Sequence, residues 1–130
     1  MKKLILFAAA FIFTASLYAA EFPTITISDL KTAMATSHVV LLDANGSDSW
    51  QQGHIPGAID FSAKQEQLAA VLPTDKNALV VAYCANPQCP AYRAAAEAAK
   101  KLGYKNIKHL TAGIMGWKEA GEKTQPGSKS

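Results

Sequence analysis

The sequence predicts an α/β fold in which a central parallel β-sheet carries helices on both faces. Short apolar runs alternate with helix-like segments between residues 24 and 120. Two of these runs, 38–44 and 78–84, are continuously apolar, which is typical of strands buried on both faces of a parallel sheet. Strands and helices that alternate in this way imply a sheet covered by helices on each side.

The first half of this pattern contains two expected strands and three expected helices. In chain order they are a strand at 24–27, a helix at 28–36, a strand at 38–44, a helix at 47–53 and a helix at 64–72. Ser28 suits the N-cap of the first helix, because its hydroxyl can accept a hydrogen bond from the first turn. Gly53 suits the end of the second helix, and Pro73 stops the third.

The second half adds two strands and two helices. In chain order they are a strand at 78–84, a helix at 90–102, a strand at 106–110 and a short helix at 116–120. The long helix has small apolar residues at helical spacing, which predicts a buried stripe that lies close to the sheet. The stripe consists of Ala91, Ala95, Ala98 and Leu102.

The start of the chain has the layout of a secretory signal peptide, which we assign to residues 1–20. Lys2 and Lys3 precede an apolar run, and the small residues Ala19 and Ala20 follow it. The run is short for a membrane span, which needs ~20 residues, so cleavage is favoured over an uncleaved membrane anchor. We therefore expect a periplasmic or secreted protein.

The rest of the chain is expected to form one domain at 21–120 and a polar, disordered tail at 121–130. The net charge of +3 falls to +1 without the two lysines of the leader. A domain so close to neutral gives no support for nucleic-acid binding. After cleavage we expect no membrane contact, and nothing in the sequence calls for a cofactor.

Both cysteines of the chain, Cys84 and Cys89, lie in one short loop. Cys84 ends a predicted strand, and ligands of parallel sheets bind at the carboxyl ends of strands. Pro90 suits the first position of the following helix and Cys89 its N-cap. The start of that helix would then face the thiols and lower their pKa, which favours a reactive thiolate over two inert cysteines. The C-x4-C spacing is poor for zinc, although two thiolates could hold a soft ion such as Cu(I).

Three segments, taken in order, resemble the rhodanese family. They are LLDANGSDSWQQGHIPGAIDF (41–61), YC (83–84) and AAKKLGYKNIKHLTAGIMGW (98–117). The resemblance covers nearly all of the chain after the leader. It implies a rhodanese-like fold and the transfer of sulfane sulfur through a persulfide on Cys84, the catalytic nucleophile. It also implies a cradle whose backbone N–H groups hold the anionic sulfur, formed by Ala85, Asn86, Pro87, Gln88, Cys89 and Pro90.

The loop CANPQCP departs from the family pattern C-x-x-G-x-R. It contains no Arg or Lys, and Arg93 lies one turn into the helix. Asn45 stands where the family commonly has Arg. Both departures weaken an assignment to thiosulfate, a dianion that favours positive charge. Pro90 also takes the place of the arginine in the C-x5-R loop of phosphatase and arsenate-reductase relatives.

The sequence thus favours an exported sulfurtransferase that uses thiosulfate, polysulfide or a persulfide as donor. The acceptor is a thiol or cyanide, and a protein thiol is an alternative. Cys89 is the candidate resolving or redox partner, because the curled loop implied by the resemblance would bring the two Cα atoms to the ~4.4–6.8 Å that a disulfide needs. Two alternatives remain: a thiol–disulfide redox protein that uses both cysteines without sulfur transfer, and a non-enzymatic module that binds a soft metal or a partner.

Four further side chains are expected to have structural roles. His54 lies in the GHIPGA turn and should orient backbone rather than catalyse. Asp43 ends a strand and should cap a neighbouring turn. Trp50 and Trp117 should belong to the core or to a pocket wall.

Overall fold

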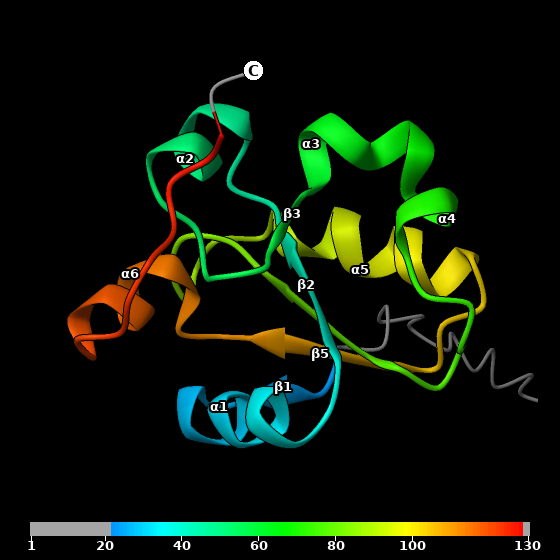
Figure 1. The fold of residues 1–130 in the computed structure, drawn as a ribbon, viewed down its shortest axis with the longest axis horizontal. Coiled ribbons are helices and arrows are strands. Elements are labelled where there is room, and N and C mark those ends of the chain that lie inside the picture. Colours follow the sequence, from blue (N-terminus) through cyan, green and yellow to red (C-terminus); the bar gives the residue numbers. More distant parts are fainter. Residues whose placement is uncertain (1–21, 129–130) are drawn as a thin grey trace, which may run out of the picture.

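The five strands found within residues 22–128 join one parallel sheet. The computed structural model describes residues 22–128, so the predicted signal peptide at 1–20 lies outside the described residues. The strands are β1 (Thr24–Ile25), β2 (Val39–Asp43), β3 (Ile59–Asp60), β4 (Leu79–Tyr83) and β5 (Asn106–Leu110). Their order across the sheet is β1-β5-β4-β2-β3, and every neighbouring pair is parallel (Figure 1). The continuous apolar runs supply the central strands, as predicted.

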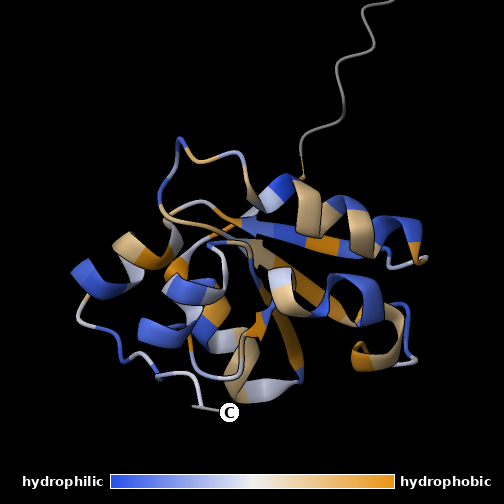
Figure 2. Cartoon of the chain, turned by 90° about the horizontal axis from the view of Figure 1, so that it is seen from above, coloured by the Kyte–Doolittle hydropathy of each residue, from blue (hydrophilic) through white to orange (hydrophobic). Residues whose placement is uncertain are grey.

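Helices cover both faces of this sheet, which confirms the predicted fold class. One face carries α3 (Phe61–Lys64), α4 (Leu68–Val71) and α5 (Tyr92–Lys101), and the other carries α1 (Ile27–Thr36) and α6 (Gly113–Glu119). Because side chains alternate along a strand, Val80 and Ala82 pack toward α5 whereas Val81 and Tyr83 pack toward α1 and α6. Figure 2 shows the hydrophobic colouring on the central strands and mixed colouring along the helices that cover them.

Two of the predicted helix starts are wrong. The N-cap of α1 is Thr26, whose hydroxyl oxygen accepts a hydrogen bond from the backbone N–H of Asp29 at 3.0 Å, so Ser28 lies inside the helix. Extended backbone at Thr26, with φ −80° and ψ 161°, explains the difference. Helix α5 begins at Tyr92 with Ala91 as its N-cap, so Cys89 and Pro90 precede the helix instead of starting it.

The later start of α5 also changes its buried face. Tyr92 points inward and the buried residues of the helix are Tyr92, Ala95, Ala96 and Ala99. Of the predicted stripe only Ala95 is fully buried, while Ala91 is exposed. None of the helices within residues 22–128 has the length and apolarity needed to span a membrane.

The expected helix at 64–72 is instead three short pieces. They are α3, the 3-10 helix η1 (Gln65–Gln67) and α4. The first piece begins earlier than predicted because Asp60 caps it, accepting a hydrogen bond from the N–H of Ala63 at 3.3 Å. The breaks fall at Lys64 and Gln67, whose backbone leaves helical geometry. Upstream, α2 (Ser47–Gln52) ends at Gly53, as predicted.

The tail beyond residue 120 is packed, which corrects the expected disorder over residues 121–128. In Figure 1 it returns past α2. Gln125 exchanges two backbone hydrogen bonds with His54, at 2.8 and 3.0 Å, and Gly127 donates to the carbonyl of Gln51. These contacts satisfy backbone groups of the GHIPGA turn that would otherwise need water.

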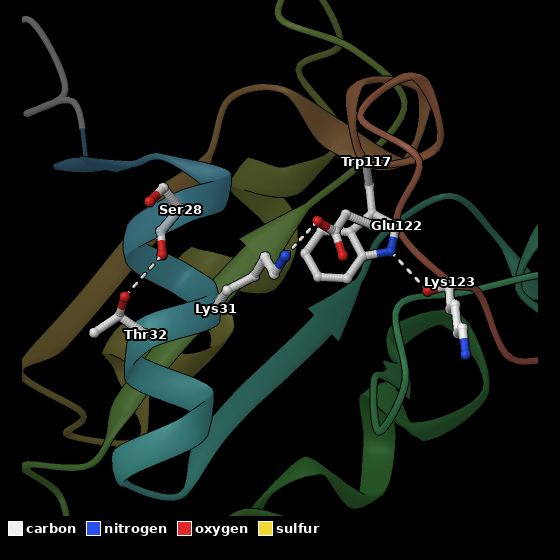
Figure 3. A network of polar contacts seen from close by, with 6 residues as sticks. All are labelled: Ser28, Lys31, Thr32, Trp117, Glu122 and Lys123. Carbon is white, nitrogen blue, oxygen red and sulfur yellow. Dashed lines mark hydrogen bonds and ion pairs between the residues drawn. The ribbon is translucent and has the colours of Figure 1, made fainter.

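The beginning of the tail also joins α6 to α1. Figure 3 shows the ion pair between Lys31 on α1 and Glu122, and the indole N–H of Trp117 donating to the carbonyl oxygen of Lys123 at 2.8 Å. Trp117 itself is buried. The tail therefore covers this side of the core.

Candidate functional site

Cys84 follows the last residue of β4 and lies at the carboxyl edge of the sheet. Cys84 is only 1% exposed and packs on the face of the sheet that α5 covers. The carbonyl oxygens of Cys84 and Ala85 accept hydrogen bonds from the N–H groups of Ile114 and Met115, at 2.9 and 3.0 Å. The first turn of α6 therefore fixes the start of the cysteine loop.

Gly113 makes this contact with α6 possible. Its φ of +64° lies in the left-handed region, and a Cβ placed there would stand 2.5 Å from the carbonyl carbon and oxygen of Ala85. No L side chain fits such a separation without a shift of the backbone. In the sequence, Gly113 is the first glycine of the motif GIMGW. Its role in packing could not be predicted, because the segment that lies against it was not known.

The loop curls back on itself around Asn86. The backbone carbonyl of Asn86 accepts from the N–H of Cys89 at 3.2 Å, and its side-chain oxygen accepts from the N–H of Gln88 at 3.0 Å. This turn brings the Cα atoms of Cys84 and Cys89 to 6.3 Å, and the two sulfur atoms form a disulfide. The expected bridging distance is confirmed.

The bridged loop leaves few donors for an anionic sulfur. Pro87 and Pro90 have no N–H, and the N–H groups of Gln88 and Cys89 are used inside the turn. The carbonyl oxygen of Cys89 lies 3.1 Å from the Cys84 sulfur. The bridged loop does not test the cradle of backbone N–H groups predicted over residues 85–90. This cradle stays a prediction for the loop in its reduced form.

A buried hydrogen-bond network supports the same edge of the sheet. The Tyr83 hydroxyl donates to a carboxylate oxygen of Asp43 at 2.7 Å and accepts from the N–H of Ile55 at 3.1 Å. The other oxygen of Asp43 accepts from the N–H of Asn45 at 2.8 Å, which confirms its capping role. Burial, and then the charge of Asp43, raises the pKa of Tyr83 far above its ordinary value, so the hydroxyl remains a donor. The sequence analysis missed Tyr83.

His54 is held as a backbone anchor, as the sequence predicts. It is 3% exposed, and its Nδ1–H donates to the carbonyl of Trp50 at 2.8 Å. Its ring stacks on Trp50 with 4.1 Å between centroids, and the indole N–H of Trp50 donates to the carbonyl of Ala58. These hydrogen bonds hold the GHIPGA turn in shape, and the N–H of Ile55 in this turn donates to the Tyr83 hydroxyl.

Among the cavities beside α5, two differ in their relation to the cysteines. A cavity of about 580 Å³ lies near the end of α5 that carries Lys100 and Gly103, and no cysteine lines it. A smaller cavity of about 260 Å³ lies at the beginning of α5, and Cys89 forms part of its wall. The smaller one is therefore relevant to the cysteine chemistry.

Comparison with known proteins agrees with this architecture. The model of the rhodanese-like domain family matches residues 26–120. A transcriptional regulator of the HTH type from Mycobacterium tuberculosis is 33% identical over 98 residues, which are 75% of this chain and 42% of that protein. The chain thus spans less than half the length of this curated relative.

Solved structures with the same fold include proteins named for sulfur transfer. Rhodanese with anions from E. coli is 26% identical, with a TM-score of 0.52, over 69% of this chain and 100% of that one. A thiosulfate sulfurtransferase from Pseudomonas aeruginosa is 23% identical, with a TM-score of 0.60, over 83% of this chain and 21% of that one. The match of the family model over most of the chain shows that this protein belongs to the rhodanese-like domain family.

Proposed function

We propose that the protein is a sulfurtransferase that carries sulfane sulfur as a persulfide on Cys84. The observation that carries this proposal is the position of Cys84, at the carboxyl end of β4 and in a curled loop before α5. Nucleophiles and ligands of α/β proteins gather at this edge. Membership of a family that includes sulfurtransferases supports the same activity.

The reaction begins when a thiol reductant opens the disulfide and supplies two electrons. The Cys84 thiolate then attacks the outer sulfur of the donor. A bond forms between this sulfur and Cys84, the sulfur–sulfur bond of the donor breaks, and the donor leaves as sulfite, a shortened polysulfide or a thiol. A thiol or cyanide acceptor next attacks the outer sulfur, and Cys84 leaves as a thiolate.

Cys89 offers a second fate for the persulfide. Its thiolate attacks the Cys84 sulfur atom, and the outer sulfur leaves as hydrosulfide, taking the proton of the persulfide. The two thiols are oxidised to the Cys84–Cys89 disulfide while the sulfane sulfur is reduced. The bridged loop corresponds to the protein product of this step.

Polysulfide or a persulfide fits the loop better than thiosulfate does. The segment 85–90 contains no cation to meet a sulfonate group. We further propose that the protein works after export, where the surroundings are oxidising and the bridge persists until it is reduced. The partners are then a small sulfur donor and a thiol or cyanide acceptor, with a protein thiol as an alternative acceptor.

Thiocyanate formation from cyanide tests the activity. The reduced protein is given polysulfide or thiosulfate, and Cys84→Ser and Cys89→Ser variants are run beside it. We expect transfer by the wild type and by Cys89→Ser, with polysulfide as the faster donor, and none by Cys84→Ser. A Cys84→Ser protein that forms thiocyanate at the wild-type rate would exclude Cys84 as the sulfur carrier.

The disulfide itself favours a second candidate, a thiol–disulfide redox protein with no sulfur step. This candidate predicts that the bridged protein oxidises dithiols in the absence of any sulfur donor and that persulfide never accumulates in Cys89→Ser.

A further inference from the structure

The disulfide has one accessible end. The cavity of about 260 Å³ is lined by Cys89 and by residues of β5 and α5, whereas Cys84 is not part of its wall. Cys84 is 1% exposed, and Cys89 is only partly buried. A nucleophile that enters the cavity therefore meets Cys89 before Cys84.

The wall of this cavity carries buried polar atoms without a hydrogen-bond partner. Within residues 22–128, the Nε2 of His109 and the hydroxyl of Thr111 have none. His109 is 6% exposed, and its ring stacks on Tyr92 with 3.4 Å between centroids. Leaving such a buried atom without a hydrogen-bond partner is unfavourable. Two such atoms on one wall indicate a place where a polar ligand completes the hydrogen bonding.

The same wall carries positive charge. Arg93 lines the cavity from α5, one residue after Tyr92. Burial, and then the charge of Arg93, lowers the pKa of His109, so the ring stays neutral and the guanidinium is the cation of this wall. An arginine beside neutral hydrogen-bonding groups favours a carboxylate.

We propose that this cavity binds a small thiol that bears a carboxylate, and that this thiol opens the disulfide by attack on Cys89. The carboxylate lies against Arg93, and the thiol points at the bridge. The volume is below the ~300–1,000 Å³ of pockets for drug-sized ligands, which suits a molecule with few heavy atoms.

The chemistry fits the buried position of Cys84. The entering thiolate forms a bond to the Cys89 sulfur, the bridge breaks, and Cys84 leaves as a thiolate. A second thiolate then attacks the mixed disulfide on Cys89, so that two thiols become an external disulfide and Cys89 becomes a thiol. Attack in the opposite sense would leave Cys84 blocked. The route deepens the proposed function, because it frees the proposed sulfur carrier in the first step.

The rate of bridge opening tests the binding site. Mercaptoacetate and 2-mercaptoethanol are compared, and each rate is divided by the rate of the same thiol on a bridged synthetic peptide of residues 83–92. Because a charge-assisted hydrogen bond is worth about 1.5–3 kcal/mol, we expect mercaptoacetate to be favoured about tenfold or more. Equal normalised rates would overturn the proposed site.

Variants locate the preference. Arg93→Gln should reduce this preference to near unity by slowing mercaptoacetate more than 2-mercaptoethanol, and Arg93→Lys should retain part of it. The matched control is Lys101→Gln, which removes a cation from the last turn of the same helix and should keep the full preference. A preference that survives in Arg93→Gln would contradict the assigned cation; if that variant does not fold, the two wild-type rates and Arg93→Lys still decide.

The site of attack is read from the trapped intermediate. The reaction is quenched with acid under excess mercaptoacetate, and the mixed disulfide is mapped by peptide mass. We expect the adduct on Cys89, and an adduct on Cys84 would overturn the route. No sulfur donor takes part, so these results stand or fall separately from sulfur transfer.

Discussion

Tyr83 on β4 and Asp43 on β2 are paired neighbours in the sheet. The hydrogen bond between their side chains lies at the carboxyl edge of the sheet, next to Cys84 in the chain. Asp43 is 1% exposed, so water cannot readily replace the Tyr83 hydroxyl as the hydrogen-bond donor to its carboxylate. The Tyr83 hydroxyl also accepts from the N–H of Ile55. One hydroxyl therefore satisfies two buried groups from two other segments.

Tyr83→Phe is expected to lower the free energy of unfolding by at least ~1–3 kcal/mol, because it leaves a buried carboxylate oxygen and a buried N–H unsatisfied. Urea unfolding of the bridged protein measures the change. The control is Tyr92→Phe, which keeps the ring stacked on His109 and removes a hydroxyl that makes no hydrogen bond within residues 22–128. Equal stability of the Tyr83 variant and the wild type would contradict the network.

His109 should make stability depend on pH. Its folded pKa is lowered from 6.5 by burial and by Arg93, so the unfolded chain binds a proton more readily than the folded protein does. The free energy of unfolding should therefore fall as the pH drops through 6.5 and stop falling below the folded pKa.

Denaturant midpoints across this pH range test the effect. His109→Gln should flatten the fall, and His38→Gln, on the exposed surface, should not. A fall of the same size in His109→Gln would assign it to other groups.

At the scale of elements, contact between the first turn of α6 and the cysteine loop depends on Gly113. Two hydrogen bonds cross this contact, and there is no room for a side chain at the glycine. Gly121 offers a matched comparison, since its φ is also positive, at +77°, but nothing lies within 4 Å of its Cβ position.

Gly113→Ala should therefore cost more than Gly121→Ala. A left-handed backbone costs an alanine ~1–2 kcal/mol at either position, and crowding against Ala85 should add about 1–3 kcal/mol at Gly113 alone. Thermal or urea unfolding of both variants measures the difference. Two equal losses would mean that the close contact with the loop has no energetic weight.

Elements with long apolar runs could be predicted from the sequence, and those decided by local hydrogen bonds could not. Strands β2 and β4 lie within one residue of their predicted bounds, because buried parallel strands require continuous apolar sequence. Strand β5 matches its predicted bounds without such a run, since its sequence NIKHL is partly polar. The start of α5 was misplaced, because Pro90 suits a helix start but the turn around Asn86 uses the residues before it.

The candidate site was predictable only where one segment contains it. The position of Cys84 and Cys89 in a single loop, together with the curl implied by the family resemblance, was sufficient to expect that the pair could be bridged. The cavity beside Cys89 was not, because it requires β5 to lie beside β4 and to bring His109 against Tyr92. Arg93 could be seen in the sequence, but its neighbours could not.

At the scale of the whole molecule, the tail holds together segments that are far apart in the sequence. It bonds to the GHIPGA turn through Gln125, to Trp117 through Lys123, and to α1 through Glu122. The ion pair with Lys31 is partly exposed, so it should contribute little, about 0–1 kcal/mol. The backbone contacts and the cover over Trp117 should matter more.

Truncation after Ala120 should lower the free energy of unfolding by about 1–3 kcal/mol, since buried donors and acceptors lose their partners. Glu122→Gln in the full chain is the control and should cost less than ~1 kcal/mol. Urea unfolding provides both values. A truncated protein as stable as the full chain would mean that the tail packs without stabilising the domain.

The intact mass of the protein after treatment with polysulfide tests the proposed sulfur carrier most directly. The protein is reduced, freed of reductant, exposed to polysulfide and desalted. We expect Cys89→Ser to gain about 32 Da as a persulfide, Cys84→Ser to gain nothing, and the wild type to lose about 2 Da as the bridge re-forms and sulfide is released. A gain of one sulfur on Cys84→Ser, or none on Cys89→Ser, would contradict the assignment of Cys84 as the residue that carries the sulfur.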